Sequence, residues 1–230
     1  MNKKIYFVTG TDTDVGKTIV SCGLLEAARL QGYKTIGLKP VSAGCYQTKD
    51  GLKNKDALAL MDAMTCKLSY EQVNPVSFKP PIAPHIAANL AGTIISIEQL
   101  ADFCRGTLLN PAEFILIEGA GGWRTPLNNH QMLSDLAKEL NTPVVLVVGV
   151  KLGCLNHACL TAEAIIRDGL KLAGWVANCI EPEMMCYEDN IKTLRSLIPA
   201  PCLGTVPYLS ELDKTLVASY FNLEGINSRK

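Results

Sequence analysis

The sequence predicts an α/β protein, with a mostly parallel sheet covered by helices on both faces. Two observations lead to this fold class: short, continuously apolar runs, and amphipathic helical patterns between them. Strands buried on both faces of a parallel sheet are apolar throughout, whereas half-exposed strands alternate in polarity. Regular alternation of strands and helices favours parallel pairing. The runs that we expect to be strands are Ile5–Thr9, Thr35–Lys39, Phe114–Glu118, Pro143–Val148, Leu172–Asn178 and Cys202–Val206.

Two helices can be placed by their periodicity and end signals. The first begins near Gly16 and ends at Gly32, and its apolar face comprises Val20, Leu24, Ala27 and Ala28. We expect the second to follow Asn156 as its N-cap and to end at Gly169. Its apolar face would comprise Ala158, Ala162, Ile165 and Ile166.

The rest of the chain shows no repeat, low-complexity tract or charged linker. The least regular regions are Val41–Asn54 and Asn74–Pro84, which we expect to be long loops. Long loops in compact domains are often functional. With 48% hydrophobic residues, the 230-residue chain can bury a substantial core, so we expect residues 1–230 to form a single domain.

Charge and hydropathy exclude several kinds of partner. Lysine plus arginine and aspartate plus glutamate number 22 each, and the sequence has no long run of like charge, so we expect no nucleic-acid binding. The longest apolar run, Val144–Val150, is far shorter than the roughly 20 residues that span a bilayer, so we expect no membrane partner. Nine cysteines without zinc-type or CxxC spacing favour a reducing, cytoplasmic location.

The first expected strand leads directly into a glycine-rich segment, Gly10-Thr-Asp-Thr-Asp-Val-Gly-Lys-Thr18, and then into a helix. This order is typical of a P-loop, in which backbone N–H groups hold phosphate, Lys17 reaches the terminal phosphates and the Thr18 hydroxyl can bind Mg²⁺. The strict motif places its first glycine at position 11, where this chain has Thr11. An ordinary strand-to-helix turn is the alternative. We therefore expect a three-layer P-loop NTPase-like domain.

A P-loop needs a carboxylate near its metal, and Glu118 lies at the carboxyl end of an expected strand. The glycines of Gly119–Gly122 would let the backbone approach a ligand closely. Metal or nucleotide contact is the favoured interpretation of Glu118, and a strand-end acid before a flexible turn is the alternative.

Two further residues are less clear from the sequence. Lys39 ends another expected strand, so it either faces the P-loop and stabilises developing charge or is a solvated lysine at the sheet edge. Asp56 begins a helix, and its position favours a helix-start acid over a metal ligand.

Taken together, the motifs resemble dethiobiotin synthetases over about nine-tenths of the chain. They are the P-loop segment, Gly37-Leu-Lys-Pro-Val41, Asn54-Lys-Asp-Ala-Leu58, Glu118-Gly-Ala-Gly-Gly122, Val148-Gly-Val-Lys-Leu-Gly-Cys-Leu-Asn-His157 and Gly174-Trp-Val-Ala-Asn178. The resemblance implies an ATP- and Mg²⁺-dependent ligase of biotin biosynthesis. Its substrates would be 7,8-diaminononanoate, CO₂ (or bicarbonate) and ATP, and its products dethiobiotin, ADP and phosphate.

The resemblance also implies roles for individual residues. Lys39 and Lys17 would be catalytic, and Thr18, Asp56 and Glu118 would hold Mg²⁺, which reverses the interpretation of Asp56 given above. ATP would contact Asp14, Val15, Gly16, Lys17, Thr18, Ile19, Asp56, Glu118, Gly119, Ala120, Gly121, Asn178, Val206, Pro207, Tyr208 and Glu211. The substrate would contact Thr13, Ser42 and Asn156. The family forms homodimers, in which Asn156 would reach the substrate carboxylate bound to the partner subunit.

Two other classes remain as alternatives. Nucleotide-switch ATPases of the partitioning or cell-division kind also have modified P-loops, but they carry a further lysine where this chain has Asp12. They also use basic surfaces or a membrane helix, whereas the segment 212–221 has a single lysine. The third class comprises other small-molecule P-loop ligases and amidotransferases.

Overall fold

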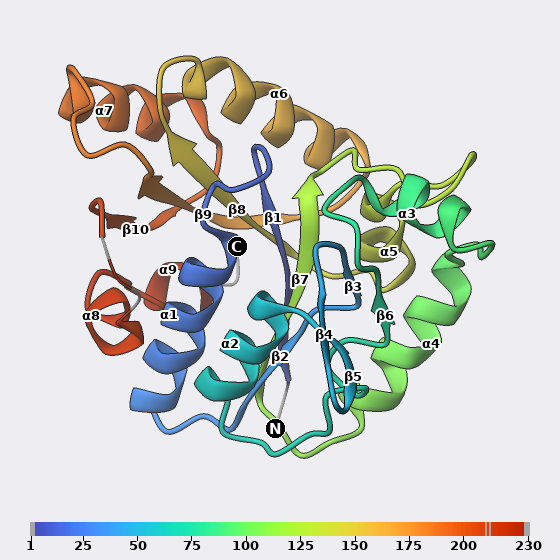
Figure 1. The fold of residues 1–230 in the computed structure, drawn as a ribbon. Coiled ribbons are helices and arrows are strands. Elements are labelled where there is room, and N and C mark those ends of the chain that lie inside the picture. Colours follow the sequence, from blue (N-terminus) through green and yellow to red (C-terminus); the bar gives the residue numbers. More distant parts are fainter. Residues whose placement is uncertain (1–2, 210, 212, 228–230) are drawn as a thin grey trace.

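A six-stranded parallel sheet forms the centre of the structure, a computed structural model that describes residues 3–209, 211 and 213–227 (Figure 1). Residue 212 of the C-terminal segment considered above lies outside the described residues. The order across the sheet is β10-β9-β8-β1-β7-β2. The strands are β1 (Lys4–Gly10), β2 (Thr35–Leu38), β7 (Phe114–Gly122), β8 (Val144–Val150), β9 (Leu172–Cys179) and β10 (Cys202–Val206).

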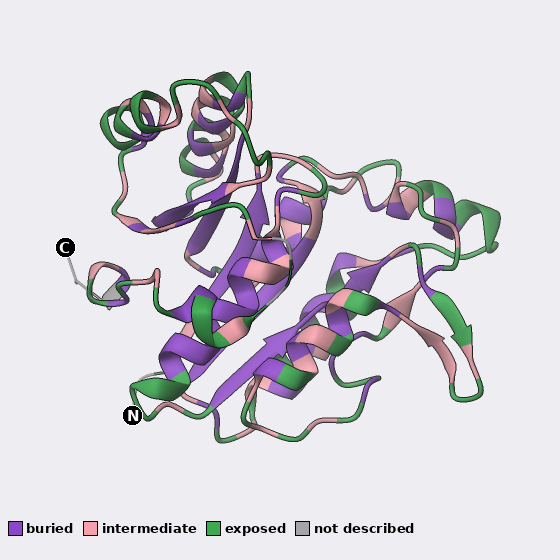
Figure 2. Ribbon diagram, turned by 60° about the vertical axis from the view of Figure 1, so that its left-hand side comes forward, coloured by how far each residue is buried: buried purple, intermediate pink, exposed green. Residues whose placement is uncertain are grey.

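These strands are buried because their side chains are apolar on both faces. All seven residues of β8 are buried, as are the first six of β7. Figure 2 shows the strands in the middle of the sheet mostly buried and the helices with one exposed side, whereas the edge strand β10 is only partly buried. Each of the six runs expected from the sequence corresponds to one strand, and the α/β class with a parallel sheet is confirmed.

Helices cover both faces of the sheet. The first apolar core lies under α1, α2, α8 and α9, and the second under α3 to α7. In Figure 1, α1 lies between α2 and α8. The helices are α1 (Lys17–Leu30), α2 (Lys55–Ala63), α3 (Pro84–Leu90), α4 (Ile97–Leu108), α5 (Leu133–Glu139), α6 (Cys154–Arg167), α7 (Tyr187–Leu197), α8 (Lys214–Ala218) and α9 (Glu224–Asn227).

Two details of α6 differ from the sequence-based expectation. The helix begins at Cys154 after Gly153, whose φ of 91° lies in the left-handed region, so the expected N-cap Asn156 lies inside the first turn. Glycine adopts that conformation without strain, so the helix begins directly after Gly153, and its first residue, Cys154, precedes Asn156 by two positions. Ile166, expected on the buried face, is 48% exposed.

The two irregular regions are not loops throughout. Residues 41–54 contain β3 (Val41–Ser42) and a short antiparallel pair, β4 (Tyr46–Thr48) and β5 (Gly51–Lys53). The second region contains β6 (Val76–Ser77), which pairs in parallel with β3. These strands of two or three residues are too short for a periodic pattern to reveal.

Two results bear on the earlier exclusions. Among the described residues, no helix combines the length and the apolar character that a membrane crossing requires. All nine cysteines lie in the described part of the chain and are free thiols.

Candidate active site

The P-loop joins the carboxyl end of β1 to the start of α1. Gly16 at the N-cap has φ 85°, and a Cβ there would lie 2.1 Å from the amide nitrogen of Asn178. Glycine is therefore required at this position for both conformation and space. No side chain of the described residues caps α1, so its first N–H groups remain available to an anion.

Lys17 lies within this loop and is 7% exposed. Its ammonium donates to the backbone carbonyl of Asp12 at 3.0 Å. Burial lowers the pKa of Lys17 to about 8, with a further contribution from the nearby positive charge of Lys39. An anion beside Lys17 would stabilise its charged form, and a phosphate bound in the loop would supply that anion.

Lys39 is buried at the centre of a cluster of charges that also comprises the buried Glu118 and the partly exposed Asp56. Its Nζ is 2.7 Å from Glu118 Oε1 and 3.1 Å from Asp56 Oδ2, and it also donates to the carbonyl of Gly119 at 3.0 Å. Burial acts to lower the pKa of Lys39, but the charges and hydrogen bonds of Glu118 and Asp56 outweigh it and raise the pKa. Conversely, burial of Asp56 favours a higher pKa, and the charge of Lys39 reverses this and lowers it.

The sequence left the orientation of Lys39 open, and the structure places the lysine on the P-loop side. The parallel register explains this, because Leu38 of β2 pairs with Ile117 of β7, and Val8 of β1 pairs with Glu118. The ends of three adjacent strands therefore lie together. Asp56 joins them from the first turn of α2, where Asn54 caps the helix by accepting from the backbone N–H groups of residues 56 and 57.

The cluster has the donor set of a magnesium site. Glu118 is 0% exposed, and its Oε2 has no hydrogen-bond partner among the described residues, while the Thr18 hydroxyl donates to its Oε1 at 2.8 Å. A buried carboxylate oxygen without a partner is costly unless a cation binds it. Within the described part of the chain, no three His, Cys, Asp or Glu side chains come close enough to hold a metal by themselves. Mg²⁺ commonly takes one or two carboxylates and completes its shell with phosphate and water, so the residues present fit this ion.

Lys17, Thr18, Lys39 and Asp56 line a cleft of about 1070 Å³ at the carboxyl ends of the strands. Ligands bind at this edge in open α/β sheets. The cleft brings together most of the phosphate, metal and substrate residues predicted from the sequence: Thr13, Asp14, Gly16, Lys17, Thr18, Ile19, Lys39, Ser42, Asp56, Ala120 and Gly121.

The other predicted residues lie around or away from the cleft. Val15 is wholly buried beneath the loop. Asn178 is 4% exposed and donates to the carbonyl of Val15 at 2.9 Å, so it supports the P-loop backbone. Val206 pairs with Asn178, whereas Pro207, Tyr208 and Glu211 beyond it are exposed. Asn156 is exposed near the start of α6.

Sequence reasoning missed several residues that shape the site. Lys151, just after β8, forms an ion pair with Asp12 of the P-loop at 3.5 Å. Arg124 lines the cleft and pairs with Asp168 at the end of α6 at 2.7 Å. Asn54, directly before a helical pattern, carried a recognisable N-cap signal. The two ion pairs join distant segments and left no local signal.

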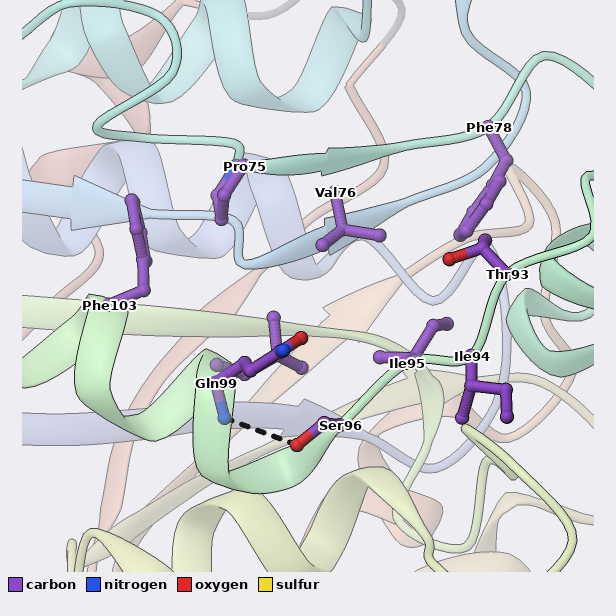
Figure 3. Close-up of a pocket in the computed structure, with 10 residues that line it drawn as sticks. Pro75, Val76, Phe78, Thr93, Ile94, Ile95, Ser96, Gln99 and Phe103 are labelled. Atoms are coloured by element: carbon purple, nitrogen blue, oxygen red, sulfur yellow. Dashed lines mark hydrogen bonds between the residues drawn. The ribbon is translucent and has the colours of Figure 1, made fainter.

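A second, smaller cavity lies between β6 and the start of α4 (Figure 3). Its volume is about 250 Å³, and its walls are mainly apolar side chains such as Val76, Ile95 and Phe103. Among the described residues, none that lines it also lines the large cleft, and none of its lining side chains is charged.

Comparisons with known proteins show which family and fold this chain resembles. The profile of the AAA domain family matches residues 4–215. The chain is 55% identical to the ATP-dependent dethiobiotin synthetase of Cellvibrio japonicus, over 97% of each chain. It is 54% identical to the enzyme of the same name from Pseudomonas paraeruginosa, over 96% of this chain and 97% of the relative.

Solved structures that resemble this one are more distant in sequence. A chain of the MinC:MinD cell division complex of Aquifex aeolicus has a TM-score of 0.56 and 13% identity, and covers 93% of this chain and 86% of its own. A ParA family ATPase from Chlorobium tepidum has a TM-score of 0.54 and 11% identity, with 94% and 89% covered. At this identity the likeness concerns the fold alone, and it confirms the P-loop NTPase fold.

Proposed function

The chain belongs to the dethiobiotin synthetase family, and from this premise we propose the reaction that it catalyses and the residues that carry it out. Membership makes the chain an ATP-dependent ligase-type enzyme of biotin biosynthesis. The proposed reaction converts 7,8-diaminononanoate, CO₂ and ATP into dethiobiotin, ADP and phosphate. The observation that carries the proposal is the pair of buried lysines, Lys17 and Lys39, beside two carboxylates at the P-loop.

The reaction proceeds in three steps. One amine of the diamine adds to CO₂ and loses a proton, which gives a carbamate anion. A carbamate oxygen then attacks the γ-phosphorus of ATP, and ADP leaves, so that a carbamic–phosphoric anhydride forms. The second amine attacks the carbonyl carbon of this anhydride, loses a proton and expels phosphate, which closes the ureido ring.

The second step brings two anions together, and this is where the lysines act. Two unit charges about 4 Å apart interact by about 4 kcal/mol at an effective dielectric constant of about 20. Lys17 would neutralise the phosphates that the loop holds, and Lys39 would face the carbamate and the transferred phosphoryl group. Mg²⁺, held by Thr18, Asp56 and Glu118, would supply further positive charge on the phosphate oxygens.

The remaining predicted residues have roles in binding. We place ATP against Asp14–Ile19 and Glu118–Gly121, with its adenine near Asn178, Val206–Tyr208 and Glu211. Thr13 and Ser42 would contact the diamine from within the same subunit.

A homodimer would complete the substrate site, with residues 1–230 acting as one catalytic domain in each subunit. Asn156 lies in the first turn of α6, and Leu152 just before that helix is 94% exposed. An exposed apolar side chain next to a helix N-terminus suits a subunit contact that presents the helix to a carboxylate. The free thiols favour a reducing, cytoplasmic setting for the reaction.

The test measures ADP release by purified protein while one reactant at a time is omitted. We expect turnover that requires the diamine, bicarbonate and Mg²⁺, and dethiobiotin in the product mixture by mass spectrometry. ATP turnover that ignores the diamine but responds to DNA or anionic vesicles would instead assign a nucleotide switch.

A further inference from the structure

A buried polar cluster lies beneath the cleft, and Asn74 is at its centre. Asn74 is 3% exposed and stands between α2 and β6. Its amide nitrogen donates to the carbonyl of Lys39 at 2.5 Å and to that of Val76 at 3.3 Å. Since both partners are acceptors, the nitrogen must face them, and the orientation of the amide is fixed.

The amide oxygen of Asn74 therefore faces the other way, and three hydroxyl groups donate to it. The distances to Asn74 Oδ1 are 2.7 Å from Ser42 and 2.8 Å from both Tyr70 and Ser77. An amide oxygen has two lone pairs. Three hydroxyl groups therefore compete for the two lone pairs of the Asn74 oxygen, which has one donor more than it needs.

The surroundings indicate which hydroxyl can turn away. Tyr70 is fixed, because its hydroxyl oxygen also accepts the backbone N–H of Asn54 at 2.7 Å. Ser42 lines the large cleft, whereas neither Tyr70 nor Ser77 is among the described residues that line it. Ser42 is 1% exposed, and besides Asn74 its hydroxyl has two weak partners, the Sγ of Cys45 at 3.2 Å and the Oγ of Ser77 at 3.5 Å.

We propose that Asn74 is a positioning residue for Ser42: its oxygen holds the Ser42 hydroxyl in the ligand-free site, and the donor surplus lets that hydroxyl turn toward an anionic oxygen bound in the cleft. When Ser42 turns, Tyr70 and Ser77 keep both lone pairs of Asn74 occupied, so no buried acceptor is left bare. The inference rests on the proposed function only for the identity of the ligand. Since Ser42 follows Lys39 by three residues, that ligand oxygen would belong to the carbamate or to the phosphoryl group.

The donor surplus is tested by unfolding, without any substrate. Ser42→Ala and Ser77→Ala are each expected to change the unfolding equilibrium constant by less than about threefold, because two donors remain in either variant. The double variant leaves one donor for two lone pairs, and we expect a change of about tenfold or more. A double variant that equals the product of the two single changes overturns the surplus.

The release of Ser42 is tested by kinetics on the same variants. Ser77→Ala removes one hydroxyl that competes with Ser42 for the Asn74 oxygen, so turning Ser42 toward the ligand would leave one lone pair of that oxygen without a donor. The KM for the diamine is therefore expected to rise about two- to tenfold, with kcat within about twofold of the wild type. In a Ser42→Ala background, Ser77→Ala should have no further effect on KM. Ser196→Ala, an exposed serine on α7 that bonds within its own helix, is the matched control.

The outcomes separate the two proposals. An unchanged KM in Ser77→Ala, or an equal rise in both backgrounds, overturns the release of Ser42. Absence of diamine-dependent turnover in the wild-type enzyme overturns the proposed function. The unfolding measurements still decide whether more hydroxyl groups donate to the Asn74 oxygen than it has lone pairs.

Discussion

Replacing Lys39 by methionine removes the buried positive charge from the cluster with Glu118 and Asp56 while keeping a side chain of similar length. Lys39 Nζ lies 2.7 Å from Glu118 Oε1, and Glu118 is 0% exposed, so the substitution leaves a buried carboxylate without its main counter-charge. Loss of one partner from a buried ion pair costs about 3–5 kcal/mol. We therefore expect Lys39→Met to lower the free energy of unfolding by about this amount in protein free of nucleotide and metal.

The double variant Lys39→Met/Glu118→Gln separates charge from packing. It removes both charges, so its loss of stability should be smaller than the sum of the single losses by about 1.5 kcal/mol or more. Urea unfolding followed by the fluorescence of the buried Trp123 and Trp175 measures all four proteins. If the losses of the two single variants simply add, Lys39 and Glu118 are not coupled and the reasoning fails.

Three further predictions concern the nucleotide site. Lys39→Ala should reduce kcat by orders of magnitude while the Kd for ATP, measured by calorimetry, changes by less than about fivefold, and equal activity would remove Lys39 from the mechanism. Gly16→Ala should abolish measurable ATP binding, because its Cβ would lie 2.1 Å from the Asn178 side chain at a φ of 85°. Retained affinity would contradict this. Burial lowers the pKa of Lys17 to about 8, and bound phosphate favours its charged form. ATP binding at about pH 8.5 should therefore take up protons, which calorimetry in buffers of different ionisation enthalpy detects; no uptake would contradict the assignment.

The sequence was sufficient for the sheet because its strands are buried on both faces. Val144–Val150 is apolar along its whole length, and such a run is recognisable without any partner. The same holds for the apolar run of β7 before Glu118, so the carboxylate could be assigned to the ligand edge, although β7 continues to Gly122. Asp56 lies in the first turn of α2, as its position in the sequence indicated. Its ion pair with Lys39 was not predictable from the residues alone, because it depends on how α2 packs.

Features that depend on backbone conformation or on short pairings were not predictable. Gly153 sets the start of α6 through a left-handed φ, whereas the asparagine-based rule chose Asn156. The β4–β5 pair is short and none of its residues is buried, so it lacks an apolar pattern. The hydroxyl groups around Asn74 converge from positions 42, 70 and 77, and only the fold reveals that they share one acceptor.

The central position of β1 in the sheet links nucleotide binding to the completion of folding. β1 pairs with β7 on one side and β8 on the other, and the bond from Thr18 to Glu118 spans 100 residues. A partly folded chain that lacks either neighbour has no closed site, so ligand would bind the native state alone and stabilise it by mass action. Recovery of ATP binding during refolding would therefore report the assembly of the middle of the sheet, a step that helix-sensitive signals do not isolate.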